Sequence, residues 1–454
     1  METAFNSRNC RGIAAAVLAS LLAFAGAFPA AFADTTKAGG YAFFDLNIAP
    51  GKSGADLGFA WLSTSAGKAA VQIAKAAYRT GSAFPAAQAK TFTGTQGQVS
   101  ATLFNGDDAS AATGQFANKV TVTGLADSTS YVYRVGDGRE WSDTFAFATQ
   151  DEKSFGFFIV GDPQLGAKST GPKTLDSDTA GWADTVAKAT GKYPTASFLV
   201  SLGDQVNDYN KRETQDAEYL AYFSPAQLRA LPAAVIEGNH DFQMGEYYGY
   251  HYNQPDLSTA YGTSYGNDGD YWFAYGNALF LMLNSNTESV ATHDLFMRKA
   301  IAKNPDAKWR IVAFHHSIYS EAEHFTDPDV VDRRNNYAPI MDRYKIDVVL
   351  QGHDHEYTRT FQMLGGKPQV DQAASADGAV ADPTGTLYVT FNSGSGSKFY
   401  DWKDQAPEVF SAARWQGKVP SFGYIELKGG SLKLSVYRTD DMSVVDSYSI
   451  EKTK

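Results

Sequence analysis

The chain has 454 residues, of which 43% are hydrophobic and 20% charged, and a formal net charge of -11. This length and composition indicate a globular protein of two to four domains and exclude a collagen, a coiled coil and a disulfide-stapled miniprotein. The acidic balance argues against nonspecific nucleic-acid binding, which needs a positive field. It does not exclude a small phosphorylated substrate, because a bound cation overrides the global field locally.

Residues 1–33 have the pattern of a secretory signal peptide. Two arginines precede the apolar run 12–28, and a small-x-small cleavage site ends at Ala33. The run is shorter than the ~20 apolar residues that a membrane span needs. The mature protein is therefore expected to be secreted or in the cell envelope, extracellular or periplasmic, without a transmembrane segment. Cleavage would also remove Cys10, the single cysteine, and with it any thiolate ligand or nucleophile.

Residues 34–150 are predicted to form a β-sandwich. Short segments of alternating polarity are separated by Gly, Asp and Ser turns, as in all-β domains. Clear examples are 57–62, 99–104, 119–123 and 131–135. The stretch from Gly124 to Tyr131 has the pattern of a tyrosine corner. The region contains no histidine, so we expect a structural or docking module there.

From residue 151 the pattern changes to α/β and defines a second domain over 151–454. Continuous apolar runs alternate with helix-like segments, which indicates buried, largely parallel strands. The runs are 155–160, 197–200, 233–236, 310–314 and 346–350, and the predicted helices are about 178–190, 213–231, 292–303 and 335–344. After residue 360 the chain returns to β character.

Each of the five apolar runs ends in a polar cluster. In chain order the clusters hold Asp162 and Gln164, then Asp204, then Asn239, His240 and Asp241, then His315 and His316, then His353 and His355. Ligands of open α/β sheets bind outside the carboxyl ends of the strands, so we expect these side chains to converge at the tips of one buried sheet. Carboxylate, amide and imidazole donors without thiolate suit Mn, Fe or Zn and, less well, Mg or Ca. The supply exceeds the need of one ion, which favours a two-metal site for phosphoryl transfer.

The ordered series Asp, Gly-Asp, Gly-Asn-His-Asp, strand-end His and Gly-His-x-His resembles the signature of the calcineurin-like metallophosphoesterase superfamily. The sandwich in front is similar to the fibronectin type III-like N-terminal domain of purple acid phosphatases. The resemblance implies a catalytic domain of two packed mixed β-sheets flanked by helices. It also implies an exported, acid phosphatase-like hydrolase with two divalent or trivalent ions. In such an enzyme a metal-bound hydroxide attacks small phosphate monoesters.

The resemblance further assigns ligands to two ions, Fe, Mn or Zn. One ion would be held by Asp162, Asp204 and His355, with Asp204 bridging, and the second by Asn239, His315 and His353.

The family pattern also assigns substrate contacts. His240 would bind the phosphate and stabilise the transition state, and Asp241 would orient it. His324 would bind phosphate and protonate the leaving group. Arg333, together with Arg334, could clamp the phosphate, although a surface role at the start of a helix fits these arginines equally well.

Three positions depart from the purple acid phosphatase pattern or leave a choice. Gln164 stands where a Gly or a ligand His is usual, and its carbonyl oxygen is expected to act as a donor. Asn207 replaces the tyrosine ligand, so the charge-transfer colour should be absent and ferric iron loses its main advantage. His315 is the preferred ligand over His316, because its spacing to Tyr319 matches the family's His-x-x-x-Tyr.

Two other functions remain open from the sequence. The same site could serve a phosphodiesterase or nucleotide hydrolase, in which the tyrosines of 247–252 stack a base, although packing is the more ordinary role of such residues. A catalytically silent cell-surface binding protein is the alternative of another class, and the intact ligand set argues against it. The metal identity and the oligomeric state stay open.

Overall fold

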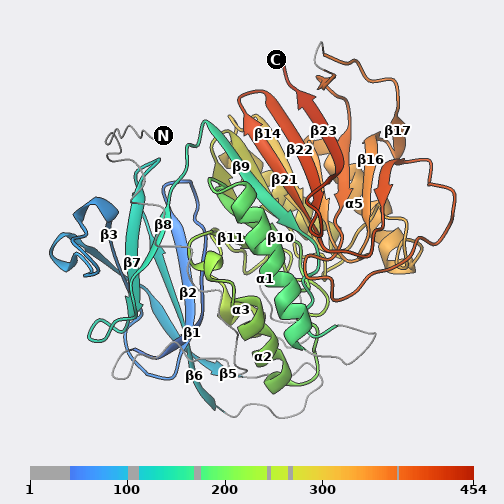
Figure 1. Cartoon of the computed structure of the whole chain (residues 1–454). Coiled ribbons are helices and arrows are strands. Elements are labelled where there is room, and N and C mark those ends of the chain that lie inside the picture. The colour runs from blue at the N-terminus through green and yellow to red at the C-terminus, as the bar shows by residue number, and fades with distance from the viewer. Residues whose placement is uncertain are drawn as a thin grey trace, which may run out of the picture. The chain divides into compact units, whose positions relative to one another are not determined.

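The computed structural model describes residues 41–100, 112–167, 175–242, 247–263, 269–375 and 378–453 (Figure 1). The predicted signal peptide, and the predicted strand 99–104 beyond Ser100, fall outside these ranges. Within them, no helix is both long enough and apolar enough to cross a membrane.

The N-terminal part is all-β, as predicted. Two four-stranded antiparallel sheets have the orders β1-β2-β6-β5 and β4-β3-β7-β8. Their strands are β1 (Phe43–Pro50), β2 (Leu57–Ser63), β3 (Ala70–Lys75), β4 (Lys90–Thr93), β5 (Thr95–Ser100), β6 (Ala112–Val122), β7 (Ser130–Gly136) and β8 (Phe145–Ala148). Alternate residues such as Phe59 and Trp61 on β2 and Tyr133 and Val135 on β7 fill one buried core.

The predicted tyrosine corner is present. The Ala126 amide donates to Tyr131 Oη at 2.8 Å, and the Tyr131 ring stacks on Phe147 at a centroid distance of 5.5 Å. Tyr131 is 6% exposed while Ala126 is exposed, so the hydroxyl fastens the surface turn to the buried ring.

The rest of the chain forms two mixed sheets. The first has the order β11-β10-β9-β21-β22-β23-β18, with β9 to β11 parallel and β21 antiparallel to β9. Its strands are β9 (Ser154–Val160), β10 (Phe198–Ser201), β11 (Ala233–Val235), β18 (Val380–Ala381), β21 (Ser421–Lys428), β22 (Ser431–Arg438) and β23 (Val444–Glu451). Figure 1 shows the C-terminal strands beside β9, which brings the end of the chain against the start of the domain.

The second sheet has the order β12-β13-β14-β15-β19-β16-β17, with β20 paired to β16. Its strands are β12 (Tyr271–Tyr275), β13 (Ala278–Met282), β14 (Trp309–Ala313), β15 (Val348–Gln351), β16 (Tyr357–Leu364), β17 (Lys367–Gln369), β19 (Thr386–Thr390) and β20 (Ser411–Trp415). Strands β13, β14, β15 and β19 are parallel.

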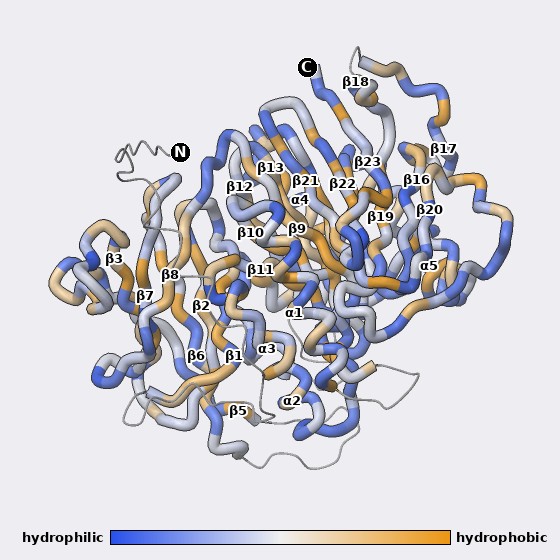
Figure 2. Tube along the Cα trace, viewed as in Figure 1, coloured by the Kyte–Doolittle hydropathy of each residue, from blue (hydrophilic) through white to orange (hydrophobic). Residues whose placement is uncertain are grey.

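Helices cover the outer face of each sheet. The inner faces share one core, with Phe157 and Val200 from the first sheet and Phe280 and Leu350 from the second. The helices are α1 (Leu175–Lys192), α2 (Arg212–Tyr222) and α3 (Tyr247–His251) on the first sheet, and α4 (Val290–Lys303) and α5 (Pro328–Tyr344) on the second. The predicted fold class is therefore confirmed, and Figure 2 shows apolar strands running through the middle of these layers.

Two of the predicted helices have different ends. The prediction 213–231 is too long, because α2 ends at Tyr222 and Pro225 then opens a separate 3-10 turn, Ala226–Arg229. The prediction 335–344 is too short, because α5 begins at Pro328, whose fixed φ and missing N–H suit the first helical position.

Replacing Tyr131 by Phe should lower the free energy of unfolding by about 1–2 kcal/mol, because the substitution leaves the Ala126 amide without its acceptor while preserving the ring. Urea unfolding followed by circular dichroism measures this difference. An unchanged midpoint and slope would show that water replaces the hydroxyl without cost.

Candidate metal centre

The five strand-end clusters converge, but from two sheets rather than from one. β9, β10 and β11 deliver the first three clusters, and β14 and β15 deliver the last two from the facing sheet. Hydrogen bonds join the two sets. The His353 amide donates to both Asp162 carboxylate oxygens at 3.0 and 2.8 Å, and His315 Nδ1 donates to the Leu202 carbonyl at 2.8 Å. The expectation of one sheet was wrong, because apolar runs do not indicate which strands pair.

Two buried carboxylates lie at the middle of the cluster. Asp162 is 0% and Asp204 2% exposed. His315 contacts both, with Nδ1 3.8 Å from Asp162 Oδ1 and Nε2 3.4 Å from Asp204 Oδ2. One ligand atom from each of these three residues lies within 4.8 Å of the other two, and among the described residues no other group of three His, Cys, Asp or Glu side chains is this compact.

The other predicted ligands surround this group. His315 Nε2 lies 2.9 Å from Asn239 Oδ1 and 3.1 Å from His353 Nδ1, so three donor atoms point toward one spot. His355 Nε2 lies 3.9 Å from Asp162 Oδ1, while its Nδ1 donates to the Lys398 carbonyl at 3.1 Å. The arrangement thus has two sides, one at His315 and one at His355.

Gln164 and Asn207, the two departures from the family pattern, contact one another. Gln164 Nε2 donates to Asn207 Oδ1 at 3.3 Å. The Gln164 Oε1 atom is buried and has no hydrogen-bond partner within the part of the chain that the structure describes. A buried carbonyl oxygen without a partner, on a side chain two residues after Asp162, fits a cation ligand.

The backbone at these strand ends is strained. Five of the twelve non-glycine residues with positive φ among the described residues belong to the cluster: Asp162, Gln164, Asp204, His353 and His355. Such conformations cost of order 1–3 kcal/mol each and persist where the surroundings enforce them. A Cβ at Gly238 would collide with the Asp204 carboxylate, and one at Gly352 with that of Asp162. The motif glycines are therefore needed for this close approach.

Burial and mutual contact set the protonation of the carboxylates and His315. Burial raises the pKa of Asp162 well above its usual range, although the His315 charge opposes this. Burial also acts to raise the pKa of Asp204, but the charges of His315 and His240 and their hydrogen bonds lower it below its usual range. Burial acts to lower the pKa of His315, but the Asp204 carboxylate outweighs it and raises the value to about 9.

Two other predicted ligands, His353 and His355, have lowered pKa values. Burial and the neighbouring imidazoles lower the pKa of His353 well below its usual range. Burial and the Lys398 charge lower that of His355 to about 3. Neutral imidazoles are in the state in which they bind metal.

His240 and Asp241 have different hydrogen-bond partners from those predicted. The His240 ring donates through Nδ1 to the Asn207 carbonyl at 2.6 Å. Asp241 accepts from the backbone amides of Gln205 and Gly238, at 3.2 and 2.9 Å. Asn207 therefore orients the imidazole, and Asp241 supports the loops around it.

His324 lies beside the cluster. Its Nδ1 is 2.8 Å from Asp327 Oδ2, and its Nε2 is 3.3 Å from Tyr400 Oη. Its ring centroid is 4.5 Å from that of His353. Asp354 accepts the His324 amide at 2.9 Å and thus holds this loop against the strand-end cluster.

Both arginines of the prediction are engaged in structural contacts. Arg333 donates to the Ser285 carbonyl at 3.0 Å and pairs with Asp329 at 2.5 Å. Arg334 donates to two carbonyl oxygens of the segment 318–325, which leads into His324. These contacts place both guanidinium groups in the support of loops.

His316, the alternative ligand, has a partner of its own. Its Nδ1 is 2.8 Å from Ser285 Oγ, and its ring centroid is 4.7 Å from that of His353. His315, not His316, belongs to the compact group with Asp162 and Asp204.

Sequence reasoning missed three supporting residues. Glu218 on α2 accepts from the amides of Asn207 and Asp208, at 2.8 Å each. Tyr400 and Lys398 come from the segment after β19. Nothing in the sequence distinguishes a buried helical glutamate or a loop lysine from exposed ones. The replacement of the family tyrosine by Asn207, in contrast, is visible in the sequence and marks the loop that Glu218 supports.

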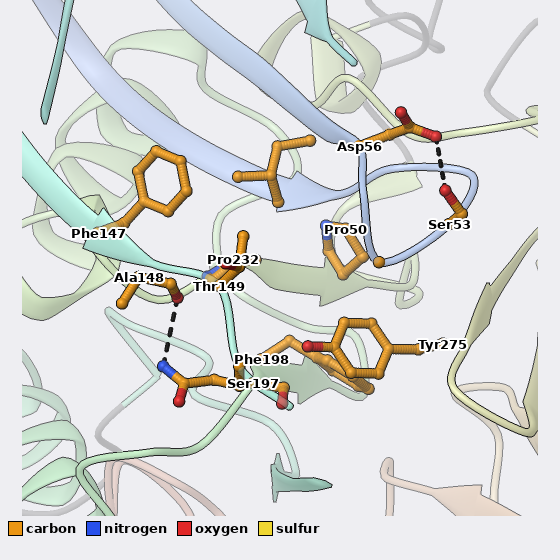
Figure 3. A pocket seen from close by; sticks show the side chains of 13 residues that line it. Pro50, Ser53, Asp56, Phe147, Ala148, Thr149, Ser197, Phe198, Pro232 and Tyr275 are labelled. Carbon is orange, nitrogen blue, oxygen red and sulfur yellow. Dashed lines mark hydrogen bonds between the residues drawn. The ribbon is translucent and has the colours of Figure 1, made fainter. Parts of the chain in front are cut away.

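A crevice elsewhere in the molecule is not this site. It is lined by Pro50 and Phe147 of the sandwich and by Ser197, Pro232 and Tyr275 (Figure 3). Ser197 and Pro232 directly precede β10 and β11, so the crevice lies at the amino ends of the strands whose carboxyl ends carry the cluster.

Comparison with known proteins agrees with this architecture. The model of the calcineurin-like phosphoesterase family matches residues 157–357, and that of the purple acid phosphatase N-terminal domain matches 44–149. Purple acid phosphatase 1 of Ipomoea batatas is 22% identical over 302 residues, 63% of this chain and 60% of that protein. The chain thus spans about 60% of the length of that curated relative.

Solved structures show the same fold. A purple acid phosphatase from yellow lupin (Lupinus luteus) seeds superimposes with a TM-score of 0.70 at 16% identity, over 91% of this chain and 75% of that one. The structure of PhoD gives 0.55 at 10% identity, over 94% and 95%. The chain therefore carries a calcineurin-like phosphoesterase domain preceded by a purple acid phosphatase N-terminal domain.

Proposed function

We propose that the protein is an exported, metal-dependent hydrolase of small phosphate monoesters with a binuclear centre. The observation that carries the proposal is the convergence of Asp162, Asp204 and His315 in one buried group. The buried Gln164 oxygen, which has no hydrogen-bond partner among the described residues, supports it. In this proposal residues 1–33 are the signal peptide, 34–150 the sandwich and 151–454 the catalytic domain.

The residues present fit two cations. Asp162, Gln164 and His355 would hold one ion, Asn239, His315 and His353 the other, and Asp204 would bridge them. When bound, the two cations would supply Lewis acidity and lower the pKa of a water molecule. The donor set contains oxygen and nitrogen only, which favours Fe, Mn or Zn.

His240 would contact the transferred phosphate. A carbonyl oxygen only accepts, so the contact with Asn207 fixes a proton on His240 Nδ1 and leaves Nε2 as the ring atom for the substrate. The fixed ring removes the need to reorganise the donor as negative charge develops on phosphate.

His324 would protonate the leaving oxygen. The Asp327 carboxylate holds Nδ1 and leaves Nε2, near Tyr400 Oη, as the ring atom that would give up the proton. Arg333 was predicted to bind substrate, but it would contribute only by holding the Ser285 segment.

The structure weakens one argument for a nucleotide substrate. Tyr247, Tyr248 and Tyr252 are each about 1% exposed and pack in the core under α3, so they cannot stack on a base. Tyr250, the fourth tyrosine of this segment, is half-buried, and its hydroxyl lies 3.1 Å from Ser100 Oγ. Base stacking by the three buried tyrosines therefore does not support a nucleotide substrate.

The test is turnover of p-nitrophenyl phosphate against bis(p-nitrophenyl) phosphate, before and after exhaustive chelation. Monoester turnover that disappears on chelation and returns with Zn²⁺, Mn²⁺ or Fe²⁺ supports the proposal. Turnover that survives chelation contradicts the metal role, and a preference for the diester contradicts the substrate class.

Asp204→Asn should lower kcat for p-nitrophenyl phosphate by about a thousandfold or more and reduce bound metal, because it removes the bridging charge. Elemental analysis and steady-state kinetics measure both effects. Asp184→Asn, which removes an exposed carboxylate paired with Lys188 on α1, is the matched control and should change neither. Full metal content in the Asp204 variant would refute its bridging role.

Metal binding at pH 7 should release at least one proton. With a pKa of about 9, His315 is protonated in the metal-free protein and must lose that proton to bind, whereas His355, with a pKa of about 3, has none to lose. Affinity should therefore fall about tenfold per pH unit below 9 for each proton released. Calorimetric titration of the metal-free protein with Zn²⁺ in buffers of different ionisation enthalpy counts the protons, and a count of zero would contradict the charge state of His315.

A further inference from the structure

The segment 392–418 brings a lysine to the rim of the metal centre. The hydroxyls of Ser393 and Ser395 donate to the carbonyls of Asp162 and Pro163, which ties the start of the segment to the first strand-end cluster. The Lys398 carbonyl then accepts His355 Nδ1 at 3.1 Å. The position of Lys398 is thus set by the backbone that supports the centre.

The Lys398 ammonium lies over an aromatic ring that contacts both sides of the centre. Its Nζ is 4.6 Å from the centroid of Tyr400. The Tyr400 ring is edge-on to His355 and to His324, each at a centroid distance of 5.3 Å. The Tyr400 ring therefore links the ammonium both to His355 and to His324, the proposed proton donor to the leaving oxygen.

Within the described residues the Lys398 ammonium has no hydrogen bond or ion pair. The other cations of the same segment are engaged: Lys403 with Thr326 Oγ1, Arg414 with Glu321, and Lys418 with Asp401. An unpaired, half-buried cation at this rim has a field that an anion could use.

We infer that Lys398 is a specificity-determining residue that binds a second anionic group, carried by the organic part of the phosphate ester. This inference rests on the proposed function and names its preferred substrates, which are phosphate esters whose leaving group bears a carboxylate or another phosphate. In the proposed function two cations and His240 would hold the transferred phosphate. Lys398, which has no hydrogen bond or ion pair among the described residues, lies over the Tyr400 ring that contacts His324 and would be free for a second anion.

The experiment compares phenyl phosphate with 3- and 4-carboxyphenyl phosphate on the metal-loaded protein. The ratio of kcat/KM for the carboxylated ester over the plain ester is measured in wild type and in Lys398→Met. Met preserves the length and apolar stem of the side chain, and leaving-group chemistry is the same in every variant. The ratio should fall about fivefold in K398M for at least one isomer, the size expected for a partly exposed ion pair.

Two further variants isolate the contact. Lys398→Arg keeps the charge and should restore most of the ratio. Lys428→Met removes the same charge from the end of β21 that pairs with Ser154, at the amino end of β9 and away from the centre, and should leave the ratio at its wild-type value. The wild-type ratio should also decrease with added salt, because screening weakens the attraction.

The outcomes distinguish this inference from the proposed function. If K398M leaves the ratio of the two kcat/KM values unchanged, whether or not both esters lose activity equally, the second-anion contact is overturned. Turnover of phenyl phosphate would then still support the hydrolase. A fall in K428M equal to that in K398M also overturns it, because the effect would then be long-range. No turnover of phenyl phosphate by the metal-loaded wild type refutes the proposed function and this inference together.

Discussion

Two carboxylates buried side by side are the constraint on which this catalytic domain depends. Asp162 and Asp204 are removed from water, and each charge is costly there unless it is paired and hydrogen-bonded. Backbone amides supply part of the compensation, from His353 to Asp162 and from His240 to Asp204 Oδ1 at 2.9 Å. In the metal-free protein the proton on His315, which contacts both carboxylates, supplies a positive charge close to them. The geometry is thus one that cations would stabilise.

Holding this arrangement requires support from outside the cluster. Residues with positive φ at the strand ends would relax unless their neighbours enforced them. Glu218 holds the loop after Asp204, Asp354 holds the loop of His324, and Ser393 holds the Asp162 carbonyl. These supports come from a helix, a strand end and the C-terminal segment. The centre is therefore preorganised by all parts of the domain, which is what precise placement of several ligands needs.

Much of this could be predicted from the sequence, for identifiable reasons. Buried parallel strands followed by Asp, Asn or His are local patterns, so the strand-end clusters and the fold class were accessible, as was the tyrosine corner at Tyr131. The pairing of strands into two sheets was not, because apolar runs of similar composition do not specify their neighbours. The partners of single polar side chains were not accessible either. Asp241 and Arg333 bond to nearby loops, and such contacts depend on the tertiary path of the chain.

The allocation of positive charge explains how an acidic protein could attract phosphate. The arginines at 333 and 334 support loops, and the strand-end imidazoles face the two carboxylates, which leaves Lys398 as the unpaired cation at the rim of the described site. Without cations, two buried carboxyl groups and one imidazolium give the site no net positive charge with which to attract an anionic ester. Cations at the same place would make the local field positive. By thermodynamic linkage, an ester that binds the loaded centre more tightly must also tighten the hold on the metal, so metal and substrate would each stabilise the other.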